Sequence, residues 1–155
     1  MHFNFTGDFI AKKPRREVYE FLTDAERFCP VLPDFKSLKI DDPEHFTVTL
    51  SVGISHIRGD AKLKLTLAEA VPPARARYVG KGDAVGGMVT IAAEFDLEDA
   101  PEGTKVLWKG HSQIAGRLPS LAGGLLEPLA KKNLMRLIDG LQAALVGEPK
   151  EPVRA

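Results

Sequence analysis

The stretch KVLWKGHSQIAGRLPSLAGGLLEPLAKKNLMRLIDGLQAAL, residues 105–145, decides the fold because its hydrophobic period changes part of the way along. Up to residue 114, apolar or small side chains alternate with polar ones, which is typical of a half-buried β-strand. Beyond Arg117, leucines recur at helical spacing, at Leu118, Leu121, Leu125, Leu129, Leu134, Leu137, Leu141 and Leu145. The stretch therefore predicts a last strand and then one long helix, whose apolar face closes the domain.

Alternation with period two also covers most of the chain before this stretch. We expect a first strand over residues 2–10 and six further strands over 35–40, 45–53, 58–70, 74–80, 87–98 and 104–114. Two short helices are expected between the first and second strands, one led by Pro14 and one capped by Asp24. The sequence thus predicts an α+β fold, in which a seven-stranded curved antiparallel sheet wraps round the long C-terminal helix.

The length and composition indicate one soluble domain. A chain of 155 residues can remove roughly 68–70% of its unfolded surface from water. We expect a single domain over residues 1–146 and a flexible tail over 147–155, where proline and charge are too frequent for packing. Basic and acidic side chains balance at 21 each, so nucleic acid is not an expected partner. The single cysteine, and an N-terminus without a signal-peptide or anchor pattern, favour a cytoplasmic protein.

Small side chains recur on the inner face that alternation assigns to the strands, at Ala61, Ala74, Ala76, Ala93 and Gly110. A sheet curled round a helix encloses more volume than these side chains fill, so we expect an apolar cavity suited to a hydrophobic small molecule. The sequence leaves open the alternative that Trp108, Tyr78 and Phe95 fill this space. The predicted ligand-binding residues are Leu63, Leu65, Ala76, Tyr78, Ile91, Ala93, Phe95, Val106, Trp108, Leu121, Leu125 and Leu129.

Residues 123–128 interrupt the helical pattern at the C-terminal end of the domain. Two consecutive glycines and Pro128 disfavour a helix interior, so a kink or a loosened turn is expected there. Two interpretations remain open. Either the segment 118–129 is a mobile apolar lid at one end of the cavity, or residues 119–124 form a loop and the helix proper begins near Leu125.

No motif in the sequence predicts catalysis, a cofactor or a metal site. The glycines at 80–86 precede a strand pattern, whereas dinucleotide binding requires a helix N-terminus at that place. The carboxylates of Glu94, Asp96 and Glu98 share the outer side of a strand, where a solvated face is expected. Cys29 has apolar neighbours, so we expect a small buried residue rather than a reactive thiol.

A family resemblance begins in residues 3–33, FNFTGDFIAKKPRREVYEFLTDAERFCPVLP, which combine an F-x-G-x-F strand, a proline-led helix ending in F-L-x-D and a cysteine–proline corner. Later segments that are similar to the same family are GKG at 80–82, TKVLW at 104–108 and IAGRL at 114–118. The sequence resembles the CoxG family, the G subunit of carbon monoxide dehydrogenase, within the START-like superfamily, also called SRPBCC, Bet v 1-like or helix-grip. The resemblance covers residues 1–145.

The resemblance implies a helix-grip fold and an accessory role beside a molybdenum hydroxylase of the carbon monoxide dehydrogenase type. It also implies a cavity that binds a quinone or a lipid-like molecule. Peripheral contact with the inner face of a membrane is a further implication, and the surface of residues 118–129 is the region expected to make it. One departure from the family pattern is the corner after Cys29, which usually continues with glycine and here continues with Val31, Leu32 and Pro33.

Three functions are compatible with these observations. The favoured one is a non-catalytic carrier of a hydrophobic molecule, because the inner face is apolar and no cofactor is indicated. The second is an enzyme of the polyketide cyclase or hydratase type on the same fold, for which Tyr78, Ser112 and the indole of Trp108 are the inward polar candidates. The third is an assembly factor that works through protein contacts alone.

Overall fold

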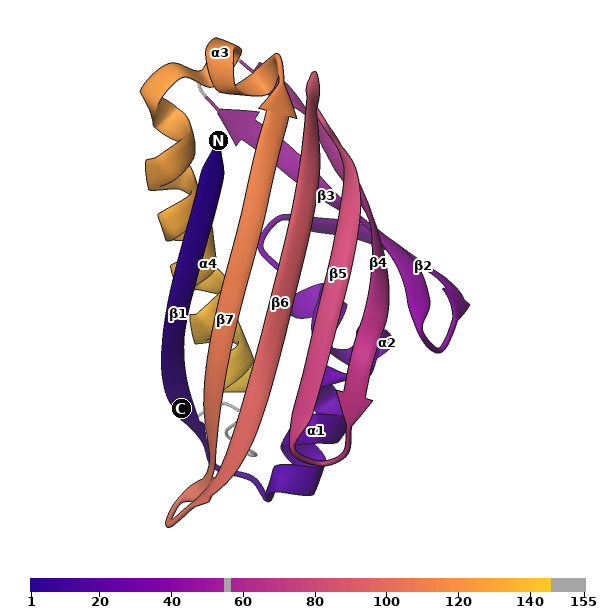
Figure 1. Ribbon diagram of the computed structural model, residues 1–155, viewed down its shortest axis with the longest axis vertical. Helices are drawn as coiled ribbons and strands as arrows, with labels where there is room; N and C mark the ends of the chain where they lie inside the picture. Colours follow the sequence, from indigo (N-terminus) through magenta and orange to yellow (C-terminus); the bar gives the residue numbers. More distant parts are fainter. Residues whose placement is uncertain (55–56, 146–155) are drawn as a thin grey trace, which may run out of the picture.

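The computed structural model in Figure 1 describes residues 1–54 and 57–145. In these residues, seven strands form one antiparallel sheet in the order β1-β7-β6-β5-β4-β3-β2. The strands are β1 (His2–Ala11), β2 (Phe35–Asp42), β3 (His45–Ile54), β4 (Ile57–Val71), β5 (Arg75–Ala84), β6 (Gly87–Ala100) and β7 (Gly103–Gly116). The predicted seven-stranded antiparallel sheet is confirmed, and each strand is longer than its predicted range.

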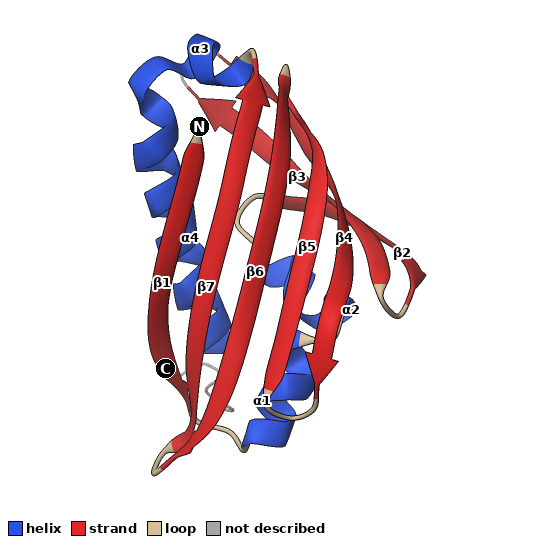
Figure 2. Ribbon diagram, in the orientation of Figure 1, coloured by secondary structure: helices blue, strands red, loops and turns tan. Residues whose placement is uncertain are grey.

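Helices cover one face of the sheet, so the molecule has two layers (Figure 2). They are α1 (Arg15–Leu22), α2 (Ala25–Phe28), the 3-10 turn η1 (Cys29–Val31), α3 (Leu118–Ala122), the 3-10 turn η2 (Gly123–Leu125) and α4 (Leu126–Ala144). The sheet twists strongly, so β2 and β3 cross the direction of β1 (Figure 2). The long helix α4 contacts β1 and η1, while α1 contacts β6 and β7. The predicted arrangement, a curved sheet round a long C-terminal helix, is therefore present.

The C-terminal helical segment is divided at its two glycines. α3 ends at Ala122, one 3-10 turn follows, and α4 begins at Leu126. The expected loosened turn is thus present, but residues 118–122 before it are helical and do not form a loop. Pro128 occupies the third position of α4, where a backbone N–H would have no partner within the helix. Pro128 is therefore compatible with the first turn of α4 and does not kink the helix.

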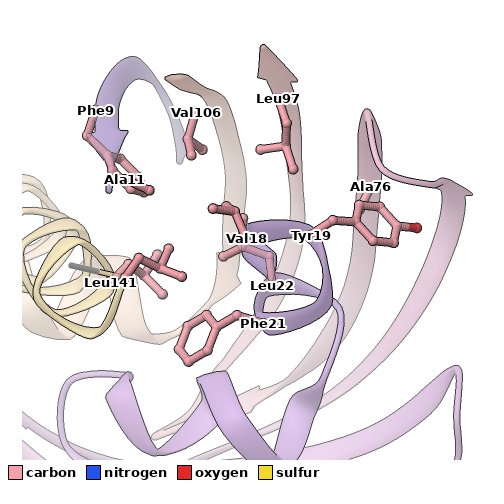
Figure 3. Close-up of a cluster of buried hydrophobic side chains, with 11 residues drawn as sticks. Phe9, Ala11, Val18, Tyr19, Phe21, Leu22, Ala76, Leu97, Val106 and Leu141 are labelled. Carbon is pink, nitrogen blue, oxygen red and sulfur yellow. The ribbon is translucent and has the colours of Figure 1, made fainter. Parts of the chain in front are cut away.

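One end of the space between the two layers is filled by α1 (Figure 3). Val18 and Leu22 of α1 belong to one buried cluster with Val106 of β7 and Leu141 of α4. Val18 and Val106 have no exposed surface. Burying a side chain of this size stabilises a fold by about 1.5–3 kcal/mol relative to leaving it in water. This cluster, the packed region, holds the C-terminal end of α4 against the sheet.

Gly7 allows the single tryptophan to lie flat against the edge of the sheet. The register of β1 and β7 places Gly7 opposite Trp108. A Cβ at position 7 would stand 2.5 Å from Cζ2 of the indole and 2.9 Å from its Cε2. No side chain larger than hydrogen fits there without moving the ring. The gap left by Gly7 in the aromatic face of β1 is therefore occupied by Trp108.

Some predictions fall outside the described residues. The end of the predicted domain at residue 146 and the predicted flexible tail, 147–155, are among them, and so is the side chain of Leu121. Within the part of the chain that is described, no helix combines the length and the apolar character needed to cross a membrane.

Candidate ligand-binding site

A cavity of about 320 Å³ lies between the inner face of the sheet and α4. Ligand pockets in proteins hold about 300–1,000 Å³, so this one is at the small end of the range. The sheet contributes Phe3, Phe5, Leu50, Ile91, Ala92, Ala93, Phe95, Trp108, Lys109, Gly110, His111 and Ser112. The turn after η1 contributes Leu32 and Pro33, and α4 contributes Ala130, Asn133, Leu134, Leu137, Ile138 and Leu141. Apolar and aromatic side chains dominate both walls.

The cavity exists because small residues meet on neighbouring strands. Ala93 of β6 lies opposite Gly110 of β7, and Gly110 lies opposite Phe5 of β1. Apart from its chain neighbours, no atom of the described residues lies within 4 Å of the place where a Cβ of Gly110 would stand. Protein interiors are normally close-packed, so open space beside a central strand is an exception that a ligand can use. The floor of the cavity is therefore bare backbone at position 110.

Two polar side chains face this space, one from each wall. Ser112 extends from β7 on the same face as Phe3 and Ile91, its partners in register, and Asn133 extends from α4. Strand alternation places the side chains of Lys109 and His111 on the outer face of the sheet, so the cavity meets their backbone. The outer position of His111 agrees with its hydrogen bond, 2.7 Å from Nδ1 to Oδ1 of Asn4. The cavity is thus apolar, with no charged side chain directed into it from the described residues.

Trp108 forms part of one wall. Its Nε1 atom is buried and has no hydrogen-bond partner in the described residues. Buried tryptophans usually satisfy this N–H group. Trp108 is the only tryptophan of the chain, so its fluorescence reports on this wall alone.

The structure brings four of the twelve predicted ligand-binding residues to the cavity. Ile91, Ala93, Phe95 and Trp108 line it from adjacent strands. Their strand faces agree with the alternation in the sequence, because register places Phe95 beside Trp108 and Ala93 beside Gly110. The aromatic side chains form walls and leave the centre of the cavity open.

The other predicted residues lie elsewhere. Leu63, Leu65 and Tyr78 pack in a buried cluster with Cys29 and Phe46. Ala76 and Val106 belong to the packed region. Leu129 packs beside a cluster at the α3 end of the sheet, and Leu125 is 49% exposed. Their distribution follows from the helices, because α1 and η1 cover the strands that carry most of them.

Tyr78 is a structural residue in this arrangement. Its hydroxyl donates a hydrogen bond of 2.9 Å to the backbone carbonyl of Leu22. Its ring contacts Phe28 and Phe46, with centroid distances of 5.5 and 5.9 Å. Burial raises the pKa of the Tyr78 hydroxyl, so the group stays protonated. Tyr78 does not line the cavity. Its hydroxyl is therefore not placed to act as an acid on a ligand there, as the sequence had suggested.

Cys29 is fully buried in the same cluster, as its apolar neighbours predicted. Burial raises the pKa of its thiol to about 12. Since the thiolate is the reactive form of cysteine, we expect little reactivity of Cys29 at neutral pH in the folded protein. It fixes the corner after α2 against the sheet.

The carboxylates on the outer side of β6 form ion pairs. Nη1 of Arg75 lies 3.2 Å from Oε2 of Glu94 and 3.0 Å from Oδ1 of Asp96, while Nε lies 3.1 Å from Oε1 of Glu69. The hydrogen bonds that the Arg75 guanidinium donates to these carboxylates raise its pKa. The cluster is on the opposite side of the sheet from the cavity, so its role is structural.

The sequence reasoning missed most of the helical wall. The helical residues selected from the sequence precede position 130, whereas the wall comes from Ala130, Asn133, Leu134, Leu137, Ile138 and Leu141. The available signal was the spacing of Leu134, Leu137 and Leu141, which places them on one face of a helix. Phe3 and Phe5 were also missed, although the aromatic alternation at the N-terminus marks the face of β1 on which they lie.

Comparison with known families assigns the chain to one of them. The model of the CoxG family, described as the G subunit of carbon monoxide dehydrogenase, matches residues 7–146. The chain therefore belongs to the CoxG family, and the resemblance seen in its sequence is confirmed. No curated protein matches the chain.

Several solved structures share the fold of this chain. A conserved protein from Geobacillus kaustophilus has a TM-score of 0.79 and 19% identity, with 92% of this chain and 95% of that one covered. A protein from Thermus thermophilus has a TM-score of 0.67 and 16% identity, over 92% and 97%. The di-domain ARO/CYC BexL from the BE-7585A biosynthetic pathway has a TM-score of 0.64 and 15% identity, over 96% of this chain and 51% of that one. At these identities the likeness shows the helix-grip fold alone.

Proposed function

We propose that this protein is a non-catalytic carrier, which holds a hydrophobic small molecule such as a quinone or a lipid in the cavity between the sheet and α4. The observation that carries the proposal is the apolar space above Gly110, which is lined by aromatic side chains and by leucines of α4. Burial of about 25 cal/mol per Å² of apolar surface would supply most of the affinity. Membership of the CoxG family supports the same class of function.

The partner that we propose is a molybdenum hydroxylase of the carbon monoxide dehydrogenase type, beside the inner face of a membrane. The family name supports the link to that enzyme. A carrier in this position would pass its apolar cargo between the bilayer and the enzyme. The proposal predicts that a tagged form of the chain, expressed in its natural host, co-purifies with components of such an enzyme.

Ligand binding is tested with the fluorescence of Trp108. Titration with a panel of quinones and fatty acids should quench or shift the emission, and native mass spectrometry should detect the bound species. Gly110→Leu is the matched control, because the added side chain enters the empty space and should abolish binding without touching the packed region. Unchanged emission and unliganded mass spectra with every compound would contradict the carrier function.

An enzyme of the cyclase type is the second candidate, because one of the similar folds belongs to a di-domain ARO/CYC protein. Such chemistry requires an acid or a base within reach of the substrate. The described side chains that face the cavity carry two polar groups, the hydroxyl of Ser112 and the amide of Asn133, and neither titrates near neutral pH. Turnover of a polyketide substrate, abolished by Ser112→Ala with the fold retained, would favour the enzyme over the carrier.

A further inference from the structure

The polar side chain that α4 contributes to the cavity, from Asn133, is oriented by a hydrogen bond with the exposed Arg136. Nη1 of Arg136 donates to Oδ1 of Asn133 at 3.2 Å, and the same Nη1 donates to Oδ2 of Asp34 at 3.2 Å. Arginine has only donors, so the atom of the Asn133 amide that meets it must be the oxygen. The amide of Asn133 therefore turns its oxygen toward Arg136.

Asp34 is in turn fixed to the sheet. Its backbone carbonyl accepts a hydrogen bond of 2.8 Å from the N–H of Ser51 in β3. Its φ of 59° lies in the left-handed region, which Asp adopts more readily than most residues. This conformation turns the chain sharply after Pro33, which itself lines the cavity. A chain of contacts thus runs from β3 through Asp34 and Arg136 to Asn133.

The orientation of Asn133 decides which polar atom is left for a ligand. With Oδ1 engaged by Arg136, the remaining group is Nδ2, whose two N–H donors make no hydrogen bond with the described residues. Ser112 on the opposite wall carries a hydroxyl, which can donate or accept. The group that Asn133 leaves free is therefore a donor, and its complement is an acceptor oxygen.

The charges around the cavity point to an uncharged ligand. The guanidinium of Arg136 is already paired with the carboxylate of Asp34, and Arg136 does not itself line the cavity. The side chains of Lys109 and His111 face the outer side of the sheet. A charged group inside this space would lose its hydration without gaining a partner, which is strongly unfavourable.

From this geometry we propose that Asn133 selects neutral apolar ligands that carry a carbonyl-type acceptor, with Arg136 and Asp34 as residues that position its amide. The proposal rests on the carrier function and specifies the chemistry of its ligand. The four aromatic side chains of the wall, from Phe3, Phe5, Phe95 and Trp108, favour a flat ring system beside that carbonyl.

A matched pair of probes tests this proposal. The compound 2-acetylnaphthalene has a carbonyl oxygen where 2-isopropenylnaphthalene has a CH₂ group, and the two are otherwise nearly identical in shape. Without a donor, the cavity should prefer the hydrocarbon, because the ketone gives up hydrogen bonds to water. With Asn133 in place, isothermal titration calorimetry should show the ketone binding at least as tightly as the hydrocarbon.

The variants separate selection by Asn133 from a general loss of the site. Asn133→Leu should weaken ketone binding about fivefold to tenfold and leave hydrocarbon binding unchanged or tighter, as expected for one lost hydrogen bond. Arg136→Met should give a smaller loss, confined to the ketone. Lys132→Met, which removes a charge from an exposed neighbour on α4, should change neither affinity.

Each outcome distinguishes this proposal from the carrier function. If both probes bind and their affinity ratio is the same in the wild type and in Asn133→Leu, selection by Asn133 is wrong and the carrier function stands. If Asn133→Leu changes the ratio and Arg136→Met does not, the positioning role of Arg136 is wrong. If neither probe binds to the wild type, the cavity does not accept ligands of this class and this proposal is wrong, while the titration with quinones and fatty acids decides the carrier function separately.

Discussion

Val106 and Gly110 lie four residues apart on the same face of β7, and their surroundings are opposite. Val106 has no exposed surface, because α1 fills the space above it. Apart from its chain neighbours, no atom of the described residues lies within 4 Å of the place where a Cβ of Gly110 would stand, because the cavity separates this position from α4. The same strand pattern thus produces a packed region at one end and a cavity in the middle. The difference lies both in the second layer and in the small residues, Ala93 and Gly110, that meet in the middle of the neighbouring strands.

The largest expected contrast is in thiol reactivity, between the cavity and a second buried cluster. Cys29 lies in that cluster with Leu63, Leu65 and Tyr78, and its labelling requires local or global opening of a structure that is stable by several kcal/mol. A Gly110→Cys substitution in a Cys29→Ser background places a thiol in the cavity. Methyl methanethiosulfonate, with mass spectrometry as readout, should modify the cavity thiol at least about a thousandfold faster than Cys29. Rates within about tenfold of each other would show that the two regions open equally.

Truncation of leucines should give the next largest contrast. Leu22→Ala removes a side chain that is 2% exposed in the packed region, and this should lower the free energy of unfolding by about 2–5 kcal/mol. Leu134→Ala enlarges a space that already exists, so its cost should be less than half as large. Urea denaturation followed by circular dichroism measures both. Equal losses would indicate that α4 packs on the sheet as tightly as α1 does.

Two glycine substitutions give a smaller and opposite pair of effects. Gly7→Ala places a methyl group against the indole of Trp108, and the resulting overpacking should destabilise the fold by about 1–3 kcal/mol. Gly110→Ala meets open space and reduces the freedom of the unfolded chain, so it should be neutral or stabilising by up to about 1 kcal/mol. Thermal unfolding of the two variants against the wild type measures the difference. A destabilised Gly110→Ala variant would mean that the space above position 110 is filled in solution.

The smallest effect concerns pH, far from both regions. In the hairpin of β2 and β3, Nδ1 of His45 lies 2.9 Å from Oδ1 of Asp42. The hydrogen bond and charge of Asp42 raise the pKa of His45, and those of His45 lower the pKa of Asp42. The contribution of His45 to stability is therefore complete below its unfolded pKa of about 6.5 and is lost as the pH rises through its higher folded value.

The contribution of Asp42 to stability depends on pH in the opposite direction. It is complete above the unfolded pKa of about 3.9 and is lost as the pH falls through the lower folded value. An NMR titration of the His45 imidazole should show its pKa fall toward about 6.5 in the Asp42→Asn variant. An unchanged titration would show that the two side chains do not pair in solution. The packed region and the cavity should be compared at one fixed pH, so that this hairpin contributes equally to both.

The strands were predictable because their signal is local. Alternation placed Phe95, Ala93 and Trp108 on the inner face correctly, and the change of period after Arg117 marked the closing helix. The cavity was only partly predictable, because its position depends on which helix covers which strand. The turn at Gly123–Leu125 lets α3 lie across the end of the sheet, so the wall is made by residues after position 129. The role of Asn133 depends on its contact with Arg136 and, through it, with Asp34, which is remote in sequence.

The absence of a side chain at position 110 has a consequence for how such a protein can change over evolutionary time. Cavity size here depends on one site that no neighbouring side chain among the described residues constrains. A mutation to alanine, serine or valine would narrow the compartment in steps while the buried clusters stay intact. Descendants of one ancestor could thus acquire different cargo preferences through a single codon, without any intermediate that fails to fold.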